Sequence, residues 1–402
     1  MSTTTRLGLT PMRPRDPLEP ARAASTLELF FDLVFVIAVS IGAGELHHAM
    51  TEGHVVDGLV SYLMVFFAIW WAWMNFTWFA TSFDTDDWLY RVVTIVQMGG
   101  VLVLAAGIEP LFVDGDFTTM VAAYVVMRVA MVAQWLRASR GDGQHRSATR
   151  SYAVGIALVQ AGWLGMLALD AGPVRNVVVP LLVLAELAVP TVAERRVRTP
   201  WHAHHITERY GCFTLILLGE SLLASSTAII GALHAEHDVA ELVALAVLTL
   251  VVTASLWWVY FWPPHHAAIG SLRQSLLYGY GHYVIFAAAG AFSAGVEVEI
   301  DVLTGHSELS ELAASFTVTV PIAVFLGMVW LVAVRRLGDR LVDAAVLAAA
   351  LLVLLDPLIP VPFAITAGVM ALLVVALVMR QGSAQAVGQH PVTSAPSHPS
   401  SR

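Results

Sequence analysis

Lysine is absent from this chain of 402 residues, so its 21 strongly basic side chains are all arginines. Cysteine occurs once, as Cys212, which excludes an intrachain disulfide framework. Charged residues form only 13% of the chain, against about 25% in a soluble domain, while 57% of the residues are hydrophobic. No phosphate-binding glycine loop, nucleophile elbow or nucleic-acid signature is present. We therefore predict a chain embedded in a lipid bilayer, with no cofactor and no nucleic-acid partner.

Apolar runs long enough to cross a bilayer occur twelve times, since a spanning helix needs about 20 mostly apolar residues. They lie at 28–49, 58–80, 91–113, 117–138, 151–170, 174–193, 207–233, 239–262, 277–299, 311–334, 340–356 and 358–379. The last two are the weakest, because "LLDPLIPVP" could instead be a break within a hairpin. The first run has no clear cleavage site and is interpreted as a retained span. The fold class predicted is an all-α, polytopic membrane protein.

Arginine placement orients these helices, because cytoplasmic loops carry the excess of positive charge. With both termini cytoplasmic, 19 arginines fall in inner segments, Arg175 falls in an outer loop and Arg128 lies within a span. The outer loops are acidic instead. Residues 1–24 and 381–402 are expected to form disordered cytoplasmic tails.

Three motifs recur in the same order along the chain. "ELFFDLVFVIAVS" begins at Glu28 and "ERYGCFTLILLGES" begins at Glu208; "IWWAW" (69–73) matches "LWWVY" (256–260), and "AAGIE" (105–109) matches "SAGVE" (293–297). These matches predict two six-helix repeats, 25–200 and 201–380. Each repeat has an even number of spans, so the two share one orientation, as in parallel-repeat transporters.

The motifs at Glu28 and Glu208 resemble those of the bacterial low temperature requirement A (LtrA) family, whose members have an acidic-aromatic first helix. The later E-R-x-G and G-E-S motifs of that family correspond here to Glu208, Arg209, Gly211, Gly219, Glu220 and Ser221. The resemblance covers about residues 22–380 and implies a multi-pass protein of the bacterial plasma membrane, without a settled activity. The first helix is also similar to that of potassium channels with an F-S-D motif, which share the two-times-six layout. Here that motif would be Phe30-Phe31-Asp32, with phenylalanine in place of serine, and the second repeat has no matching aspartate.

Glu28 and Asp32 lie one helical turn apart, near the cytoplasmic end of the first span. Ionisable groups within a span are costly, roughly 2.5–3.5 kcal/mol each, and usually face the bundle interior and pair. One interpretation is a structural anchor that holds Arg22 or Arg209. The other makes the two acids part of a path for a charged species.

Glu220 lies about 18 Å into the seventh span, near the midplane. Gly219 beside it is expected to allow a close helix approach. Either Glu220 pairs with Arg128, or it binds a proton or cation. In the repeat alignment Glu220 matches Ser40 and Cys212 matches Asp32. The two acids could then mark successive stations about 12 Å apart along one path.

Other polar residues are weaker candidates. Glu186 and His282 lie within spans, although a lone histidine there is more often a packing residue. The repeat-matched Glu109 and Glu297 could attract cations to an outer mouth or simply be solvated. His204 precedes Glu208 by four residues, a spacing that can bind a metal, but we expect no metal site. The matched tryptophan clusters are expected to pack between helices rather than form a ligand cage.

These patterns predict a transporter or ion-conducting protein with a polar path between the repeats, and a proton or cation as its ligand. The alternatives are a membrane enzyme or sensor with a histidine-rich cytoplasmic edge, or a structural membrane protein of stress or cold adaptation. An enzyme is the less favoured class. The substrate and the oligomeric state remain open. The candidate site residues are Glu28, Asp32, Ser40, Glu109, Arg128, Glu208, Arg209, Glu220, Ser221, His282 and Glu297.

Overall fold

The computed structural model describes residues 8–20, 22–234, 240–359 and 363–388, and every regular element in these ranges is helical. The first half contains α1 (Thr26–Thr51), α2 (Val55–Phe83), α3 (Trp88–Ala106), α4 (Ile108–Asp114), α5 (Thr118–Gly141), α6 (Arg146–Met166) and α7 (Pro173–Ala193). The second half contains α8 (Ala203–His234), α9 (Ala240–Phe261), α10 (Leu272–Thr304), α11 (Glu311–Val332), α12 (Arg340–Leu355) and α13 (Ala364–Gly388). Short 3₁₀ turns lie at His265–Ala268, Val334–Leu337 and Asp356–Leu358.

Ten helical segments of the described chain are long and apolar enough to cross a membrane. The predicted all-α, polytopic class is therefore confirmed. The predicted span 91–113 comprises α3 and α4, which are separated at Gly107. The two other predicted spans correspond to α6 and to the apolar part of α13, Ala364–Arg380, which is shorter than the ten. A total of twelve spans stays a prediction.

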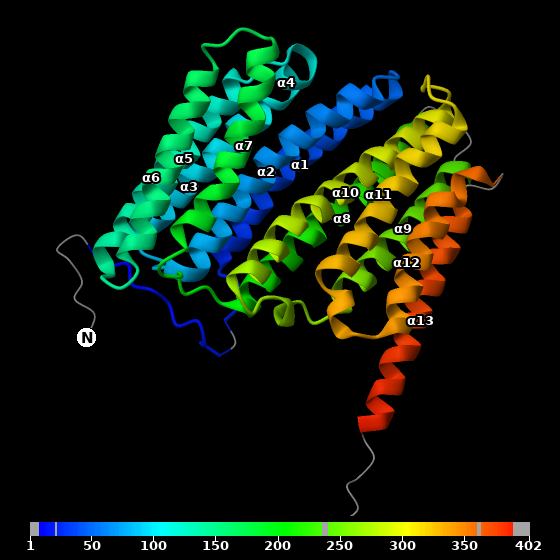
Figure 1. The fold of residues 1–402 in the computed structure, drawn as a ribbon. Coiled ribbons are helices and arrows are strands. Elements are labelled where there is room, and N and C mark those ends of the chain that lie inside the picture. The colour runs from blue at the N-terminus through cyan, green and yellow to red at the C-terminus, as the bar shows by residue number, and fades with distance from the viewer. Residues whose placement is uncertain (1–7, 21, 235–239, 360–362, 389–402) are drawn as a thin grey trace, which may run out of the picture.

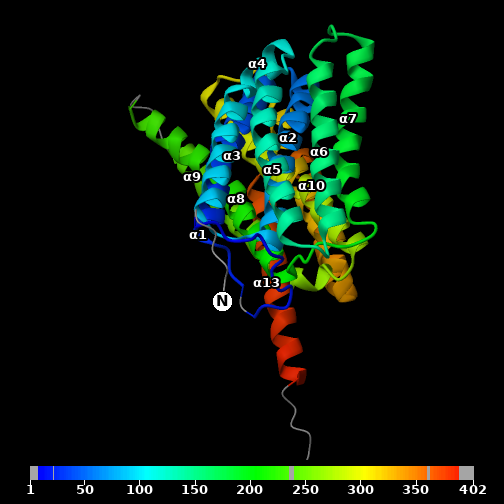
Figure 2. The same ribbon diagram turned by 90° about the vertical axis from the view of Figure 1, so that its left-hand side faces the viewer.

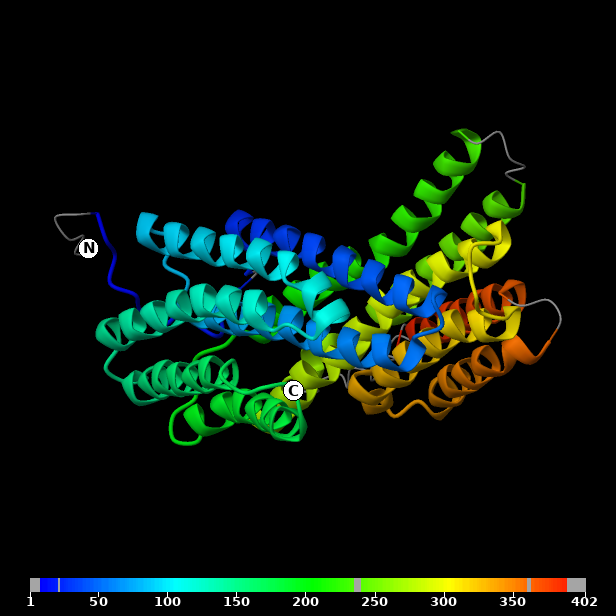
Figure 3. The same ribbon diagram turned by 90° about the horizontal axis from the view of Figure 1, so that it is seen from above.

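The two halves lie side by side with their helices roughly aligned (Figure 1). They meet where α1 and α2 pack against α8 and α10, and the view from above shows this central seam (Figure 3). Packing follows one order in each half: α3 on α5, α5 on α6 and α6 on α7, and likewise α10 on α11, α11 on α12 and α12 on α13. The seam therefore contains the first helix of each half.

The motif glycines Gly107, between α3 and α4, and Gly295, in α10, lie at close helix contacts. A Cβ atom on Gly295 would lie 2.3 Å from the carbonyl oxygen of Thr317 in α11. A Cβ atom on Gly107 would lie 2.9 Å from the backbone nitrogen of Met120 in α5. Only glycine allows so close an approach without a shift of the neighbouring backbone. Gly107 thus allows the close packing of the α3–α4 junction on α5, and Gly295 allows the close packing of α10 on α11.

One end of the bundle collects the arginine-rich segments, and we call it the arginine-rich face. The N-terminal segment runs along this face below α2 and α5 (Figure 2). Its Thr10 amide donates to Asp87 (3.0 Å), its Arg15 amide donates to the Ser82 carbonyl (2.9 Å), and its Met12 side chain is buried. The expectation of a disordered tail over 1–24 is therefore wrong for the described residues of that segment, because backbone hydrogen bonds and an apolar anchor hold them.

The opposite end is called the acidic face. Here the Glu308 amide donates to the Thr51 carbonyl (3.1 Å), and Arg175 donates to the carbonyl of Gly115 (3.4 Å). At the other terminus α13 continues to Gly388, so residues 381–388 are helical rather than disordered. The remainder of that predicted tail, and residues 1–7, lie outside the described residues.

The two tryptophan clusters occupy different environments. Trp70, Trp71 and Trp73 of α2 are buried, whereas Trp257 and Trp258 of α9 are 42% and 38% exposed. The first cluster packs between helices, as predicted, and Trp71 and Trp73 also donate hydrogen bonds to buried acids. The α9 tryptophans face outward.

Candidate functional site

The seam between the halves contains a buried ion cluster near the arginine-rich face. Arg209 of α8 donates through Nε (3.0 Å) and Nη2 (2.5 Å) to Asp32 of α1, and its Nη1 lies 3.0 Å from a Glu28 oxygen. Trp73 Nε1 donates to Asp32 (2.7 Å), and His205 Nε2 lies 3.3 Å from Glu28. We call the four ionisable residues, Glu28, Asp32, His205 and Arg209, the arginine-face cluster.

Local sequence places Glu28 in this cluster. Ser25 caps the start of α1 by accepting from the Glu28 amide, and the Glu28 carboxylate accepts from the Ser25 amide (2.8 Å), which completes a capping box. Of the two arginines predicted to hold the acids, Arg209 does so. Arg22 instead donates to the carbonyls of Ala80 and Thr81 at the end of α2.

The buried charges of this cluster hold the two halves together at the arginine-rich face. Glu28, Asp32, His205 and Arg209 are each at most 1% exposed. Charges so deeply buried are tolerated only when they are paired and hydrogen-bonded. The cluster therefore joins α1 to α8 and closes the seam at the arginine-rich face.

Farther along the same two helices, Ser40 Oγ donates to Glu220 Oε1 over 2.6 Å. Glu220 is 7% exposed, and within the described ranges no arginine or histidine forms an ion pair with it. The alternative in which Glu220 pairs with Arg128 is wrong, because the Arg128 guanidinium lies 3.5 Å from Glu186 in the first half. The hydroxyl group of the neighbouring Ser221 lies 3.0 Å from the Thr253 hydroxyl group of α9.

Gly219 does not provide the close helix approach that the sequence suggested. A Cβ atom at this position would meet nothing within 4 Å, and the residue faces outward. The helices approach each other on the Glu220 side of α8, where the Ser40 side chain is short.

A third group of polar residues lies toward the acidic face. The His47 ring lies 3.2 Å from Glu297 through Nδ1 and 2.6 Å from Asp301 through Nε2. Thr51 Oγ1 donates to the same Asp301 oxygen (3.2 Å). Glu297 lies on α10, which packs against α8, the helix that carries Glu220. We call His47, Thr51, Glu297 and Asp301 the acidic-face cluster.

Aromatic rings separate the Ser40–Glu220 pair from the arginine-face cluster. Phe213 of α8 stacks on Trp73 (4.5 Å between ring centroids), contacts Phe286 of α10 (5.1 Å) and meets Phe35 of α1 edge-on (6.3 Å). Phe35 follows Asp32 and precedes Ser40 on α1, and Phe213 lies between Arg209 and Glu220 on α8. These four rings form an aromatic layer across the seam.

His282 is a fully buried residue with both ring nitrogens in use. Nδ1 lies 2.7 Å from the Tyr278 carbonyl, which can only accept, so Nε2 accepts from the Tyr260 hydroxyl (3.0 Å). His265 is held in the same way, with Nε2 against the Tyr260 carbonyl (2.6 Å) and Nδ1 against the Tyr278 hydroxyl (3.1 Å). This network favours two neutral histidines that fasten α9 to α10.

This geometry predicts a pH-dependent stability. Burial lowers the pKa of His265, which lies in a turn outside the spans, from 6.5 to about 4. The unfolded chain therefore takes up this proton at a higher pH than the folded chain. The stability due to neutral His265 is complete above pH 6.5 and is lost as the pH falls toward 4. Between pH 7 and pH 5 the loss is about 2 kcal/mol.

Chemical denaturation of the detergent-solubilised protein at the two pH values measures this loss. His265→Gln keeps an amide donor for the Tyr260 carbonyl and cannot titrate, so its free energy of unfolding should change with pH by about 2 kcal/mol less than that of the unaltered chain. Equal pH slopes in the two proteins would contradict the assignment.

The histidine-rich edge at the start of α8 is structural where it is buried. His202 Nε2 lies 2.9 Å from the Glu19 carbonyl and so fastens the N-terminal segment. His204 is exposed and stacks on His266, 4.0 Å between ring centroids, and Glu208, four residues farther along α8, is also exposed. Over the described residues, no group of three or more histidine, cysteine or acidic side chains could hold a metal ion.

Several residues of the seam were not singled out from the sequence. His47 falls within the predicted span 28–49 and Asp301 lies just beyond the predicted span 277–299, and no sequence pattern pairs these two residues. The sequence does not distinguish His205 from the neighbouring histidines, because its burial arises from packing against α1. Conversely, the predicted candidate Glu109 is exposed on α4, whereas its repeat match Glu297 lies in the seam.

The fold and this series of buried polar groups define a polytopic helical membrane protein with a polar seam between two helical halves. The chain belongs to the family described as bacterial low temperature requirement A protein (LtrA), which it matches over residues 23–379. A protein of Rhizobium meliloti (strain 1021), itself described as uncharacterized, is 26% identical over 289 residues, which cover 66% of this chain and 68% of the relative. The family predicted from the two motifs is thus confirmed.

Proposed function

We propose that this protein moves a proton or a small cation across the bacterial plasma membrane along the seam between its halves. The proposal rests on the position of Glu220, which accepts a hydrogen bond from Ser40 where α1 meets α8. A carboxyl group at this depth needs a proton or a cation to offset the cost of burial, and no cationic side chain in the described chain forms an ion pair with it. A mobile proton or cation would supply that charge.

The order of groups along the seam supports a gated path. The acidic-face cluster gives carboxylates above Glu220, and the aromatic layer lies between Glu220 and the arginine-face cluster. A cation would therefore reach Glu220 from the acidic face and be stopped by the aromatic rings. Passage to the other side requires the layer and the ion cluster to open, as in transporters whose halves rock about a central site.

We further propose that the two halves are parallel six-helix repeats, 25–200 and 201–380. The repeat-matched residues Ser40 and Glu220 contact each other directly, and the matched glycines Gly107 and Gly295 lie at the matching helix contacts. Such a repeat would place Glu220 on the boundary between two similar halves, where substrate sites of this architecture lie.

The arginine-rich face is proposed to be cytoplasmic, with both chain termini on that side. In a Cys212→Ser background, single cysteines at Thr51 and Ser307 should react with a membrane-impermeant thiol reagent in intact cells, and a cysteine at Ser147 should react only after lysis. Labelling of the cysteine at position 147 in intact cells would contradict the proposed orientation.

Flux measurements on the purified protein in liposomes test the proposed activity. Entry of protons, sodium, potassium and rubidium is followed under an imposed membrane potential, with protein-free liposomes as the control. We expect one of these ions to enter at least ten times faster with the protein present. Equal rates for every ion in the two preparations would reject the proposal.

A further inference from the structure

His47 of α1 contacts both carboxylates of the acidic-face cluster. Its Nδ1 atom lies 3.2 Å from an oxygen of Glu297, and its Nε2 atom lies 2.6 Å from an oxygen of Asp301. Both acids belong to α10, so the imidazole ring links the first helix of one half to the other half. The side chains of His47, Glu297 and Asp301 are 12%, 28% and 24% exposed, so water on the acidic side can exchange protons with them.

These two contacts require two protons. A ring nitrogen and a carboxylate oxygen attract each other at such distances only when one of them carries a hydrogen atom. Either His47 is an imidazolium between two carboxylates, or neutral His47 donates to Asp301 and accepts from a protonated Glu297. Thr51 Oγ1 also donates to Asp301 (3.2 Å), which favours the ionised form of that acid. In both forms the three groups share two protons, and the loss of one turns a contact into repulsion between lone pairs.

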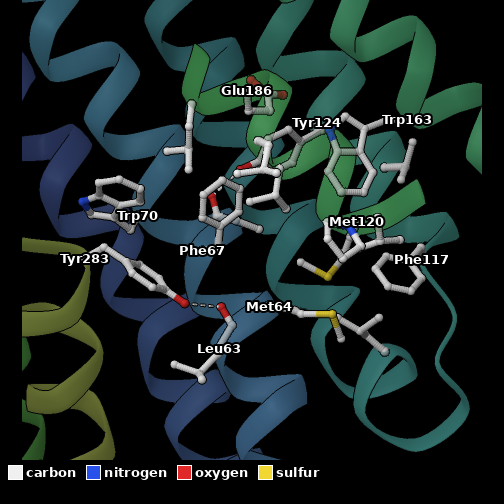
Figure 4. Close-up of a pocket in the computed structure, with 18 of the residues that line it drawn as sticks. Leu63, Met64, Phe67, Trp70, Phe117, Met120, Tyr124, Trp163, Glu186 and Tyr283 are labelled. Atoms are coloured by element: carbon white, nitrogen blue, oxygen red, sulfur yellow. Dashed lines mark hydrogen bonds between the residues drawn. The ribbon is translucent and has the colours of Figure 1, made fainter. Parts of the chain in front are cut away.

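Other links between the halves do not titrate near neutral pH. Arg209 keeps its charge at every cellular pH, whereas histidine changes charge between pH 5 and 8. In the middle of the seam, Tyr283 of α10 donates to the Leu63 carbonyl of α2 (2.8 Å, Figure 4), and Tyr62 donates to the Ala287 carbonyl (2.8 Å). A phenol also keeps its proton over this range. These links can therefore hold the seam while its acidic end opens.

We propose that His47, Glu297 and Asp301 form a proton-binding site that acts as a latch on the seam. With two protons bound, the latch joins α1 to α10 and closes the seam at the acidic face. When the pH on that side rises, one proton passes to water, the remaining proton can satisfy only one contact, and the helices separate at this end. The effect on flux rests on the proposed transport, because the open latch exposes the way to Glu220, but the separation itself does not.

The surroundings of the latch supply a matched control. Ionisable side chains toward this end of the packed helices include Glu45 and His48 on α1, Asp57 on α2, Glu109 on α4, Glu220 on α8, Glu241 on α9, Glu299 on α10 and Glu311 on α11. The ring of His48 lies 4.9 Å from that of His47 and titrates in the same pH range. His48 is exposed and forms neither latch contact, so His48→Gln is the control substitution.

Distances between spin labels on the two halves test the latch without a flux assay. In a Cys212→Ser background, Val113→Cys on α4 and Leu312→Cys on α11 place labels at positions near the acidic face that are 71% and 49% exposed. The purified protein in detergent is measured by double electron–electron resonance at pH 5 and at pH 8, the limits of the histidine range. We expect the distance to be longer at pH 8 by about 2 Å or more, the scale of helix shifts between states.

Two substitutions identify the groups that hold the protons. Glu297→Gln carries an amide hydrogen, which it can donate to Nδ1 of a neutral His47, so both contacts persist and the distance should stay short at pH 8. His47→Phe removes both contacts, so the distance should be long at both pH values. His48→Gln should respond to pH as the unaltered latch does.

Three results would overturn the proposal. One is an equal distance at pH 5 and pH 8 with the latch residues unaltered. Another is a full pH response in the Glu297→Gln protein, and the third is loss of the response in the His48→Gln protein. If the distances change as expected while liposomes show no flux, the proposed transport is rejected and the latch is retained.

Discussion

Arg209→Met is expected to destabilise the protein by about 3–5 kcal/mol, the range measured when one partner of a buried ion pair is removed. The substitution would leave Asp32 without a cationic partner among the described residues and Glu28 with His205 alone, which carries a charge only when it is protonated; both acids are 1% exposed. The measurement is chemical denaturation in detergent, supported by the fraction of monodisperse protein after purification.

The control is Arg91→Met, which removes an ion pair of similar length, 2.8 Å to Asp86, whose side chains are 57% and 55% exposed. Exposed pairs contribute at most about 1 kcal/mol, so little change is expected. Adding Glu28→Gln and Asp32→Asn to Arg209→Met should restore most of the loss, since no unpaired charge then remains. Equal stability of the Arg209→Met and Arg91→Met proteins would show that the arginine-face cluster does not stabilise the contact between the halves.

Glu220→Gln is expected to reduce flux at least tenfold while leaving the free energy of unfolding nearly unchanged. Glutamine has the shape of the acid, and its amide oxygen can still accept from Ser40 over the 2.6 Å contact. It cannot take up a proton or balance a cation. A purely structural Glu220 would predict the opposite result, with lower stability and intact flux in the molecules that fold.

Glu109→Gln is the matched control for this substitution, because it removes an exposed acid near the same face of the bundle. Its flux should stay within about twofold of the unaltered protein, since surface charges change local ion concentration only modestly at physiological salt. Flux lost equally in both variants would point to a surface-charge effect instead of a binding carboxylate.

Much of this architecture could be predicted from the sequence because the bilayer imposes simple rules on composition. Apolar runs of about 20 residues located the helices, including most ends to within a few residues. Apolar length could not locate the break at Gly107, because α4 is itself apolar and simply begins a new helix after the glycine. The N-terminal segment was misjudged because its order depends on hydrogen bonds to α2 and to residues beside α3, such as Asp87.

The site was only partly predictable, for a different reason. Periodicity and insertion cost mark an acid as buried, but they do not identify its partner. Glu220 and Arg128 both lie deep in their helices, so a pairing was reasonable from depth alone, yet Arg128 lies beside Glu186 of α7 and Glu220 beside Ser40 of α1. The repeat alignment carried better information, since it matched Ser40 to Glu220, and these two residues form the hydrogen bond.

Side-specific blocking at Ser40 tests the central claim, that the transported ion passes Glu220 from the acidic face. A Ser40→Cys variant in the Cys212→Ser background is reconstituted in one orientation and treated from either side with a small, water-soluble, positively charged thiol reagent. The account predicts that reagent on the acidic side stops flux and that reagent on the arginine-rich side does not, because the aromatic layer and the arginine-face cluster lie between. Unchanged flux after complete modification of this cysteine would contradict it.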